Sequence, residues 1–135
     1  RNANEATTIS ALRTIQQAES TFQISTTEGN FGTLSELNSK GLIHDEISNA
    51  TSAATSKNGY FFTLTATPKT AGANAVFECD AQPFQHISVS QFAATGSRRF
   101  YIIENGVIYY NLDNAVITVN SSTDRIVNNA SPLLN

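Results

Sequence analysis

The stretch FYIIENGVIYY, residues 100–110, constrains the fold of this chain more than any other part of its sequence. Its two apolar halves flank Asn105-Gly106, a dipeptide typical of the two-residue type I′ turn, because both central residues of that turn need a positive φ. The sequence therefore predicts a β-hairpin in which Glu104 faces Val107. The pairs that follow along this hairpin are Ile103 with Ile108, Ile102 with Tyr109, and Tyr101 with Tyr110.

This hairpin is apolar on both of its faces. Successive side chains of a strand point to opposite sides. One face then carries Phe100, Ile102, Val107 and Tyr109, and the other carries Tyr101, Ile103, Ile108 and Tyr110. Two apolar faces need two covers, and we expect the N-terminal helix to provide one and the segment 112–127 to provide the other.

The Arg98-Arg99 pair before this run invites comparison with RNA-binding sheets, whose signature places a glycine after the basic residue and spaces the aromatics. Here the glycine is missing, and the neighbouring Phe100 and Tyr101 must point to opposite faces of the strand. The net charge of −3 also argues against a nucleic-acid partner. We expect the two arginines to be solvated or to meet acidic residues of a neighbouring subunit.

The N-terminal region has the periodicity of an amphipathic helix. Apolar residues recur every three or four positions between residues 6 and 22, which is the spacing of one helical face. The residues of this predicted face are Ala6, Ile9, Leu12, Ile15, Ala18 and Phe22. Arg13 and Glu19 are expected to lie outside this face and, with Arg98 and Arg99, are our candidate subunit contacts.

A short second helix is predicted over residues 34–40. Thr33 and Glu36 have the spacing of a capping box, and Gly41 follows where a helix often ends in a left-handed residue. The polar residues 44–58 show no periodicity and predict a connecting segment. The whole of residues 26–58 therefore joins the long helix, residues 1–25, to a sheet.

Two further strands alternate clearly. In residues 60–67 the face formed by Tyr60, Phe62, Leu64 and Ala66 is predicted to point inward, and Pro68 ends the strand. In residues 76–83 the inward positions are Phe77, Cys79 and Ala81. Residues 68–75 predict a turn, residues 84–94 a loop, residues 114–120 one more strand, and residues 121–135 an irregular tail.

These elements predict one α+β domain over residues 1–135, with the long N-terminal amphipathic helix packed on an antiparallel sheet of three to five strands within residues 59–120. Only 14% of the residues are charged, against about 25% in average soluble domains. A polar but sparsely charged surface favours an extracellular or cell-envelope protein.

No set of residues predicts catalysis, a cofactor or a metal. Cys79 is the only cysteine, so the chain has no intrachain disulfide or CxxC pair, and its place on an apolar strand face predicts a buried small side chain. His44 and His86 have no partner at metal-ligand spacing and are expected on the surface. The acidic residues form no close pair suited to acid–base chemistry, and we expect no enzymatic activity.

Five segments in the same order resemble the type IV pilins and type II secretion pseudopilins of the prepilin-type superfamily. They are RNANEATTISALRTIQQAESTFQ, GNFGTLSELNSKGLI, KNGYFFTLTATP, DAQP and TGSRRFYIIENGVIYYN, and they span roughly residues 1–111. The first is similar to the second half of the long pilin helix. The others resemble the passage after that helix, the G-Y-x-F strand, the x-A-x-P segment and the hairpin of the same group.

This resemblance implies a structural subunit of a type IV pilus-like filament or pseudopilus, assembled by packing of the helices with the sheet and loops exposed. It implies a bacterial cell-envelope location: an inner-membrane anchor through an N-terminal segment absent here, then a periplasmic or extracellular filament. The implied partners are identical or related subunits, a prepilin peptidase that cuts a leader, and the assembly machinery. A methylated N-terminus is implied for the mature chain, and no family role carries over to Glu5.

The chain departs from the family in two places. Many type IV pilins close a C-terminal loop with a disulfide, which one cysteine cannot form. The calcium loop of the major pseudopilins is not recognisable, although Asn111, Asp113, Asn114 and Asp124 supply oxygen atoms in residues 111–124. Whether that region binds calcium, and whether the chain is a major pilin, a minor pilin or a pseudopilin, stays open. The alternative is a monomeric extracellular binding or adhesin module that uses loops around residues 68–94.

Overall fold

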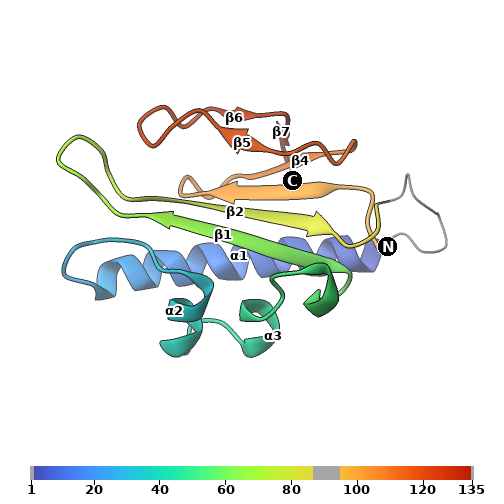
Figure 1. The fold of residues 1–135 in the computed structure, drawn as a ribbon, viewed down its shortest axis with the longest axis horizontal. Coiled ribbons are helices and arrows are strands. Elements are labelled where there is room, and N and C mark those ends of the chain that lie inside the picture. Colours follow the sequence, from blue (N-terminus) through green and yellow to red (C-terminus); the bar gives the residue numbers. More distant parts are fainter. Residues whose placement is uncertain (1, 87–94, 135) are drawn as a thin grey trace.

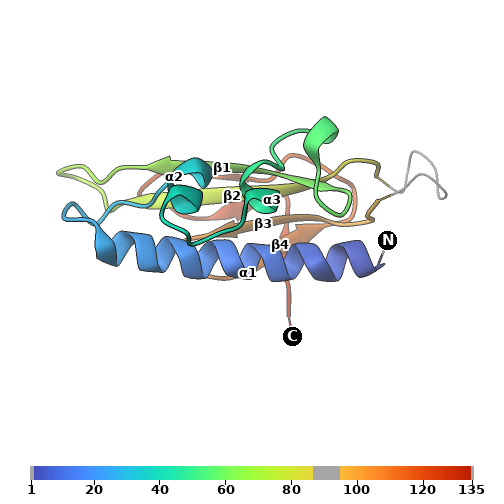
Figure 2. The same ribbon diagram turned by 90° about the horizontal axis from the view of Figure 1, so that it is seen from below.

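The structure, a computed structural model, describes residues 2–86 and 95–134. Its helices are α1 (Asn2–Ser25), α2 (Leu34–Ser39) and α3 (Asp45–Ser48), with a 3-10 turn η1 (Ala53–Thr55). Figures 1 and 2 show α1 lying along one face of a sheet, with α2 and α3 beside it. With 24 residues, α1 is about 36 Å long. The α+β class predicted from the sequence is confirmed.

The main sheet is antiparallel and has five strands in the order β1-β2-β3-β4-β7. These are β1 (Tyr60–Thr67), β2 (Val76–Pro83), β3 (Arg99–Ile103), β4 (Ile108–Asn111) and β7 (Ser131–Pro132). The alternation of β1 and β2 is confirmed, because Tyr60, Phe62, Cys79 and Ala81 are buried. Part of the predicted loop 84–94, residues 87–94, lies outside the described residues.

The short helix α2 begins at Leu34 as predicted and ends at Ser39, one residue earlier than predicted. Thr33 N–H donates to Glu36 Oε1 over 2.9 Å, and Glu36 N–H donates back to Thr33 Oγ1 over 3.2 Å, which completes the capping box. Gly41, with φ of 73°, donates its N–H to the Asn38 carbonyl. The following connection is more ordered than predicted, because α3 and η1 lie within it and Ile47 and Ala50 are buried.

The predicted hairpin exists, but the predicted turn type is wrong, and the predicted register of the two strands is wrong by one residue. Gly106 has a φ of 78° and donates its N–H to the Ile103 carbonyl, whereas Asn105 does not have a positive φ. This is a three-residue loop with the glycine in the left-handed position. The strands therefore pair Ile102 with Ile108 and Tyr101 with Tyr109.

This one-residue change moves every β4 side chain to the other face. Phe100, Ile102, Ile108 and Tyr110 face the main core with α1. Tyr101, Ile103 and Tyr109 face the opposite side, and Val107 is 38% exposed. The predicted face assignments of Val107, Ile108, Tyr109 and Tyr110 are therefore corrected, while those of the β3 residues are confirmed.

The second face of the hairpin is covered by the C-terminal segment, as predicted. Buried Ile117 packs with Tyr101 and Ile103, and Val119 and Val127 add partly buried contacts. Val119 and Val127 belong to a small second sheet of β5 (Thr118–Val119) and β6 (Val127–Asn128), and Ile117 directly precedes β5; this sheet lies over the β3–β4 part of the main sheet (Figure 1). The expectation of an irregular tail over residues 121–135 is wrong, because β6 and β7 lie within it.

Candidate functional site

The buried face of α1 differs from the predicted stripe at its N-terminal end. Leu12, Ile15, Ala18 and Phe22 are buried as predicted, but Ala6 is exposed and Ile9 is only partly buried. The sheet instead covers three polar side chains of α1, which are Glu5, Thr8 and Glu19. The contact stripe runs through residues 5, 8, 12, 15, 19 and 22, and this alternation of three and four residues is a helical face with two carboxylates in it.

The opposite side of α1 is exposed and almost uncharged. Arg13 is the one charged residue of this outer stripe, which we define as Ala3, Ala6, Thr7, Ser10, Arg13, Gln17, Thr21 and Ile24. The hydroxyl groups of Thr7 and of Thr14 beside this stripe donate to the backbone carbonyls of Ala3 and Ser10, so these hydroxyls are already hydrogen-bonded within the helix. Small side chains of this kind allow another helix to approach closely.

Glu5 is joined to the segment before β3. Its Oε2 accepts the Ser97 N–H at 2.7 Å and the Ser97 hydroxyl at 2.8 Å, and its Oε1 accepts from Arg98 Nε at 2.7 Å. Burial by itself raises the pKa of Glu5, but these hydrogen bonds and the Arg98 charge outweigh burial and hold it below its usual value. Arg98 is therefore paired within the chain and also lies over the Phe100 ring.

Arg99 is not a solvated arginine either. Its side chain is 9% exposed, and it makes a bidentate pair with Asp80 of β2 through two contacts of 2.9 Å. Its Nη1 also donates to the Asn114 carbonyl, which ties the C-terminal segment to the sheet. Burial raises the pKa of Asp80, and the guanidinium opposes that rise. The expectation of a solvated arginine pair is thus corrected for both residues, because each meets a carboxylate of this chain.

Arg125 holds the second sheet against the main one. Its Nε and Nη2 donate to the two oxygens of Glu104 at 2.7 Å, and its Nη1 lies 3.5 Å from Glu78 Oε1. Nη2 also donates to the Phe77 carbonyl over 3.2 Å. The carboxylates raise the pKa of Arg125 against the lowering effect of burial, so this cation stays charged at any physiological pH.

Glu19 is a buried carboxylate with no cationic partner among the described residues. Its side chain is fully buried, and its Oε1 accepts the N–H of Gly32 at 2.7 Å. Its Oε2 is buried and has no hydrogen-bond partner among residues 2–86 and 95–134. Burial raises the pKa of Glu19 to about 7, against the lowering effect of the Gly32 amide, and the like charge of Glu36 adds to the rise. Because it is fully buried, Glu19 is corrected as a candidate subunit contact.

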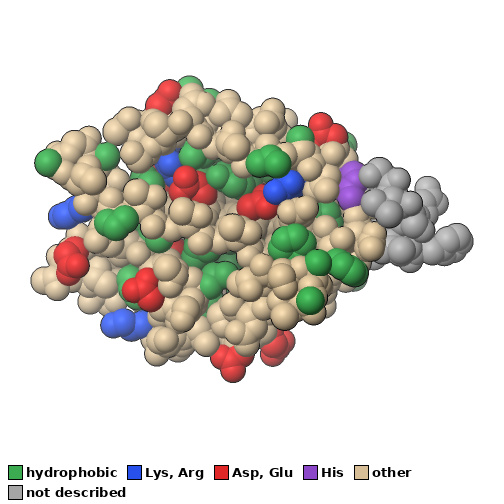
Figure 3. All heavy atoms as spheres, viewed as in Figure 1, with side chains coloured by type: hydrophobic (Ala, Val, Ile, Leu, Met, Phe, Trp, Pro, Cys, Tyr) green, Lys and Arg blue, Asp and Glu red, His purple; other side chains and the backbone are tan. Residues whose placement is uncertain are grey.

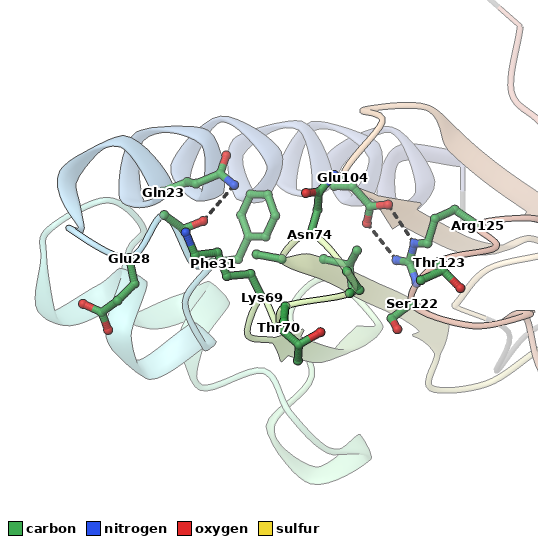
Figure 4. A pocket seen from close by; sticks show the side chains of 16 residues that line it. Gln23, Glu28, Phe31, Lys69, Thr70, Asn74, Glu104, Ser122, Thr123 and Arg125 are labelled. Atoms are coloured by element: carbon green, nitrogen blue, oxygen red, sulfur yellow. Dashed lines mark hydrogen bonds and ion pairs between the residues drawn. The ribbon is translucent and has the colours of Figure 1, made fainter.

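A groove of about 1300 Å³ lies at the C-terminal end of α1 (Figure 4). One wall is the segment 28–33 with the half-buried ring of Phe31, and the other is the Glu104–Arg125 pair with Ser122 and Thr123. The turn 69–76 forms the floor. The charged residues of the groove balance, since Glu28 and Lys69 accompany the paired Glu104 and Arg125. The groove is therefore neutral and polar.

The remaining candidate residues of the sequence lie apart from this groove. Cys79 is fully buried, and burial raises the pKa of its thiol, so it is not a nucleophile. His44 is exposed before α3. His86 is buried, not on the surface as expected, because its Nε2 lies 3.0 Å from the Leu112 carbonyl and 3.2 Å from that of Ser97.

The side chains of residues 111–124 that carry oxygen atoms form hydrogen bonds within two turns. Asn111 donates to the carbonyls of Ala115 and Asn129, and its own side-chain oxygen accepts from the Asn114 N–H. Asp124 instead accepts from Asn120, in the turn between β5 and β6. Within residues 2–86 and 95–134 no group of three or more His, Cys, Asp or Glu side chains is arranged to hold a metal ion.

The surface is polar with few charged groups. The face shown in Figure 3 has isolated red and blue side chains among neutral ones. Several of the charged side chains form the ion pairs described above, and Lys57 forms another ion pair with Glu46 at 3.8 Å. Among the helices that the structure describes, none combines the length and the apolar character needed to span a membrane.

The sequence reasoning missed the acidic partners Glu5, Asp80 and Glu104. One signal was available for Glu5 and Glu19. Both fall on the three-and-four spacing of Leu12, Ile15 and Phe22, and a carboxylate on a buried stripe needs a partner. The choice of partner carried no such signal, because Glu5 and Arg98 are 93 positions apart.

Comparison with known proteins returned no match to a protein-family model, to a characterised protein or to a solved structure.

Proposed function

We propose that this chain is the globular domain of a structural filament subunit of the type IV pilin and pseudopilin kind. Its activity is assembly, with the outer stripe of α1 packed against helices of neighbouring subunits and the sheet and loops on the outside. The partners are copies of the chain or related subunits, and the place of action is the bacterial cell envelope. The sequence resemblance over residues 1–111 is the reason for naming this family.

One structural observation carries the proposal. One side of the long helix α1 packs against the sheet, and the other side is exposed over the full length of the helix. The exposed side carries mostly small and neutral side chains, with Arg13 as its single charged residue. A helix that only supported a sheet in a monomer would more often be charged on its outer side. Five of the eight side chains of the outer stripe are Ala, Ser or Thr, which fits close packing with another helix.

A thiol-accessibility experiment on the full-length protein tests this. The native Cys79 is fully buried and is not expected to react in the folded protein, so a single new cysteine reports its own surroundings. Ser10→Cys lies in the outer stripe, and Thr118→Cys on the exposed side of β5 is the matched control. In assembled filaments we expect a bulky maleimide to label Thr118→Cys but not Ser10→Cys, and both to be labelled in the dissociated protein.

Two results would overturn the proposal. One is a full-length, leader-processed protein that neither forms nor joins filaments. The other is equal labelling of both cysteines in every preparation. The gene upstream of Arg1 gives an independent check, since the proposal expects a short basic leader ending in Gly and then about 20 apolar residues with one Glu.

The groove favours a second candidate, a monomeric extracellular binding module. Its concave shape, with the Phe31 ring among polar side chains of the 69–76 turn and the 122–125 loop, suits a small soluble ligand. This candidate expects the isolated domain to retain a ligand from the surrounding medium, and deletion of the gene to leave surface filaments intact. The loss of filaments on deletion would reject it.

A further inference from the structure

The buried stripe of α1 carries two carboxylates in different settings. Both accept a backbone N–H at 2.7 Å, Glu5 from Ser97 and Glu19 from Gly32. Glu5 also has the Arg98 guanidinium and the Ser97 hydroxyl. Within the part of the chain that the structure describes, Glu19 has neither a cation nor a second donor. Removing an ionised carboxylate from water without compensation is far more costly than burying a neutral carboxylic acid. Ionisation of Glu19 therefore destabilises the folded state more than ionisation of Glu5 does.

The charged and titratable groups near Glu19 do not compensate it. Glu36 on α2 has the same sign, and the Cys79 thiol on β2 is neutral. Lys40, which follows α2, lies over the Phe22 ring at 5.9 Å, and Glu28 at the start of the adjoining segment is exposed. The Gly32 amide is the one group that lowers the pKa of Glu19. An ionised Glu19 must therefore gain water.

The contact between Glu19 and Gly32 also fixes a segment of irregular backbone. A Cβ on Gly32 would lie 3.0 Å from the Phe22 ring, so this backbone rests directly on α1. After Gly32, Thr33 is held by the capping box of α2, and before Gly32 the segment has few other contacts. Gln23 donates to the Gly29 carbonyl, Lys69 N–H donates to Asn30 Oδ1, and the Phe31 ring packs edge-on against Phe77.

This same segment is a wall of the groove. Gly29 and Phe31 line it, opposite Glu104 and Arg125 (Figure 4). Residues 28–32 of this segment lie outside every helix and strand, and Thr33 after them is the N-cap of α2. The segment is therefore the element that can move to let water reach Oε2, while α1 and β2 keep their internal hydrogen bonds.

We propose that Glu19 is a protonation-dependent anchor for the segment 28–33. With the proton bound, the neutral acid keeps Gly32 on α1 and the groove wall in place. When the proton leaves to solvent, the segment lifts to hydrate the carboxylate and the groove changes shape. The raised pKa of about 7 puts this change within the ordinary environmental range of an envelope protein.

Amide hydrogen exchange on the unmodified chain tests the anchor. Protection factors, corrected for intrinsic exchange, are compared at pH 5.5 and pH 8.5 for the Gly32 and Phe31 amides. The Ser97 amide on Glu5 is the internal control, because its carboxylate is already ionised at both values. We expect a loss of protection of roughly 30-fold at the segment, from the 1.5 pH units above a pKa near 7, and no change at Ser97.

The variant Glu19→Gln completes the test. Its amide keeps the acceptor for the Gly32 N–H but cannot ionise, so we expect the segment to keep its protection at pH 8.5. Unchanged protection of Gly32 in the natural chain would overturn the proposal. So would a loss spread over the whole chain, or a loss at 28–33 that persists in Glu19→Gln. The comparison of Gly32 with Ser97 in the natural chain decides the proposal even if the variant fails to fold.

Discussion

Replacing Glu19 by Gln should stabilise this protein at alkaline pH. In the folded state burial raises the pKa of Glu19 from 4.5 to about 7. The folded state therefore holds a proton between these values that the unfolded state has released, and stability falls as pH rises through that interval. The contribution of the neutral acid is fully present below pH 4.5 and is lost above about pH 7.

The magnitude follows from the same interval. At about 1.4 kcal/mol per pH unit, the distance from 4.5 to about 7 corresponds to about 3 kcal/mol of stability lost on full ionisation. Only part of it falls within a convenient range, because Glu19 is already partly ionised in the unfolded chain at pH 5. We therefore expect the difference in unfolding free energy between Glu19→Gln and the natural chain to grow by about 2–3 kcal/mol from pH 5 to pH 8.5.

Urea denaturation of both proteins at pH 5, 6, 7 and 8.5 measures this difference. The change with pH is the decisive quantity, because the Gln amide brings an unpaired N–H₂ whose cost does not depend on pH. Other titrating groups, such as Asp80, are common to both chains and cancel. Glu28→Gln, at an exposed position, is the control and should follow the natural chain. Parallel stability curves for Glu19→Gln and the natural chain would refute the reasoning.

Three further outcomes are expected from the structure. Arg125→Met should cost about 1–3 kcal/mol in urea denaturation, because it removes the guanidinium from the Glu104 and Glu78 carboxylates and leaves Glu104 only the Phe77 N–H; a cost equal to that of exposed Lys69→Met would contradict it. Gly106→Ala should cost about 1–2 kcal/mol because its φ is 78°, whereas Gly72→Ala, at an open position without positive φ, should be neutral by thermal melting. Glu5 has a lowered pKa, so its contribution to the free energy of unfolding is present above pH 4.5 and is lost as the pH falls below that value. Glu5→Gln should therefore reduce the loss of stability at acid pH, and an unchanged loss would argue against the ion pair with Arg98.

Much of the secondary structure could be predicted because its causes are local. The capping box of Thr33 and Glu36 needs only residues three apart, and the alternation of β1 and β2 needs only residues two apart. The cover over the second hairpin face was also predictable, since exposing Tyr101 and Ile103 to water would be unfavourable. The turn of the hairpin was less certain, because Asn-Gly serves both two-residue and three-residue loops.

The candidate site could not be predicted to the same depth. Its polar contacts join residues that the sequence keeps far apart, such as Glu5 with Arg98 and Arg99 with Asp80. Ala6 and Glu5 illustrate the difficulty, because hydrophobicity favours burying Ala6, yet Glu5 is the residue that faces Arg98. The rotation of a helix on a sheet depends on what the sheet presents, and adjacent residues then exchange roles.

The sequence by itself determined the long amphipathic helix, the α2 cap, the strands and the need to cover an apolar hairpin twice, since each rests on spacing within a few residues. Only the tertiary structure decided the hairpin register, the pairing of the arginines and the difference between Glu5 and Glu19. Those outcomes depend on which groups meet across the fold. One buried carboxylate meets a cation and the other does not, and nothing in the spacing of α1 distinguishes the two.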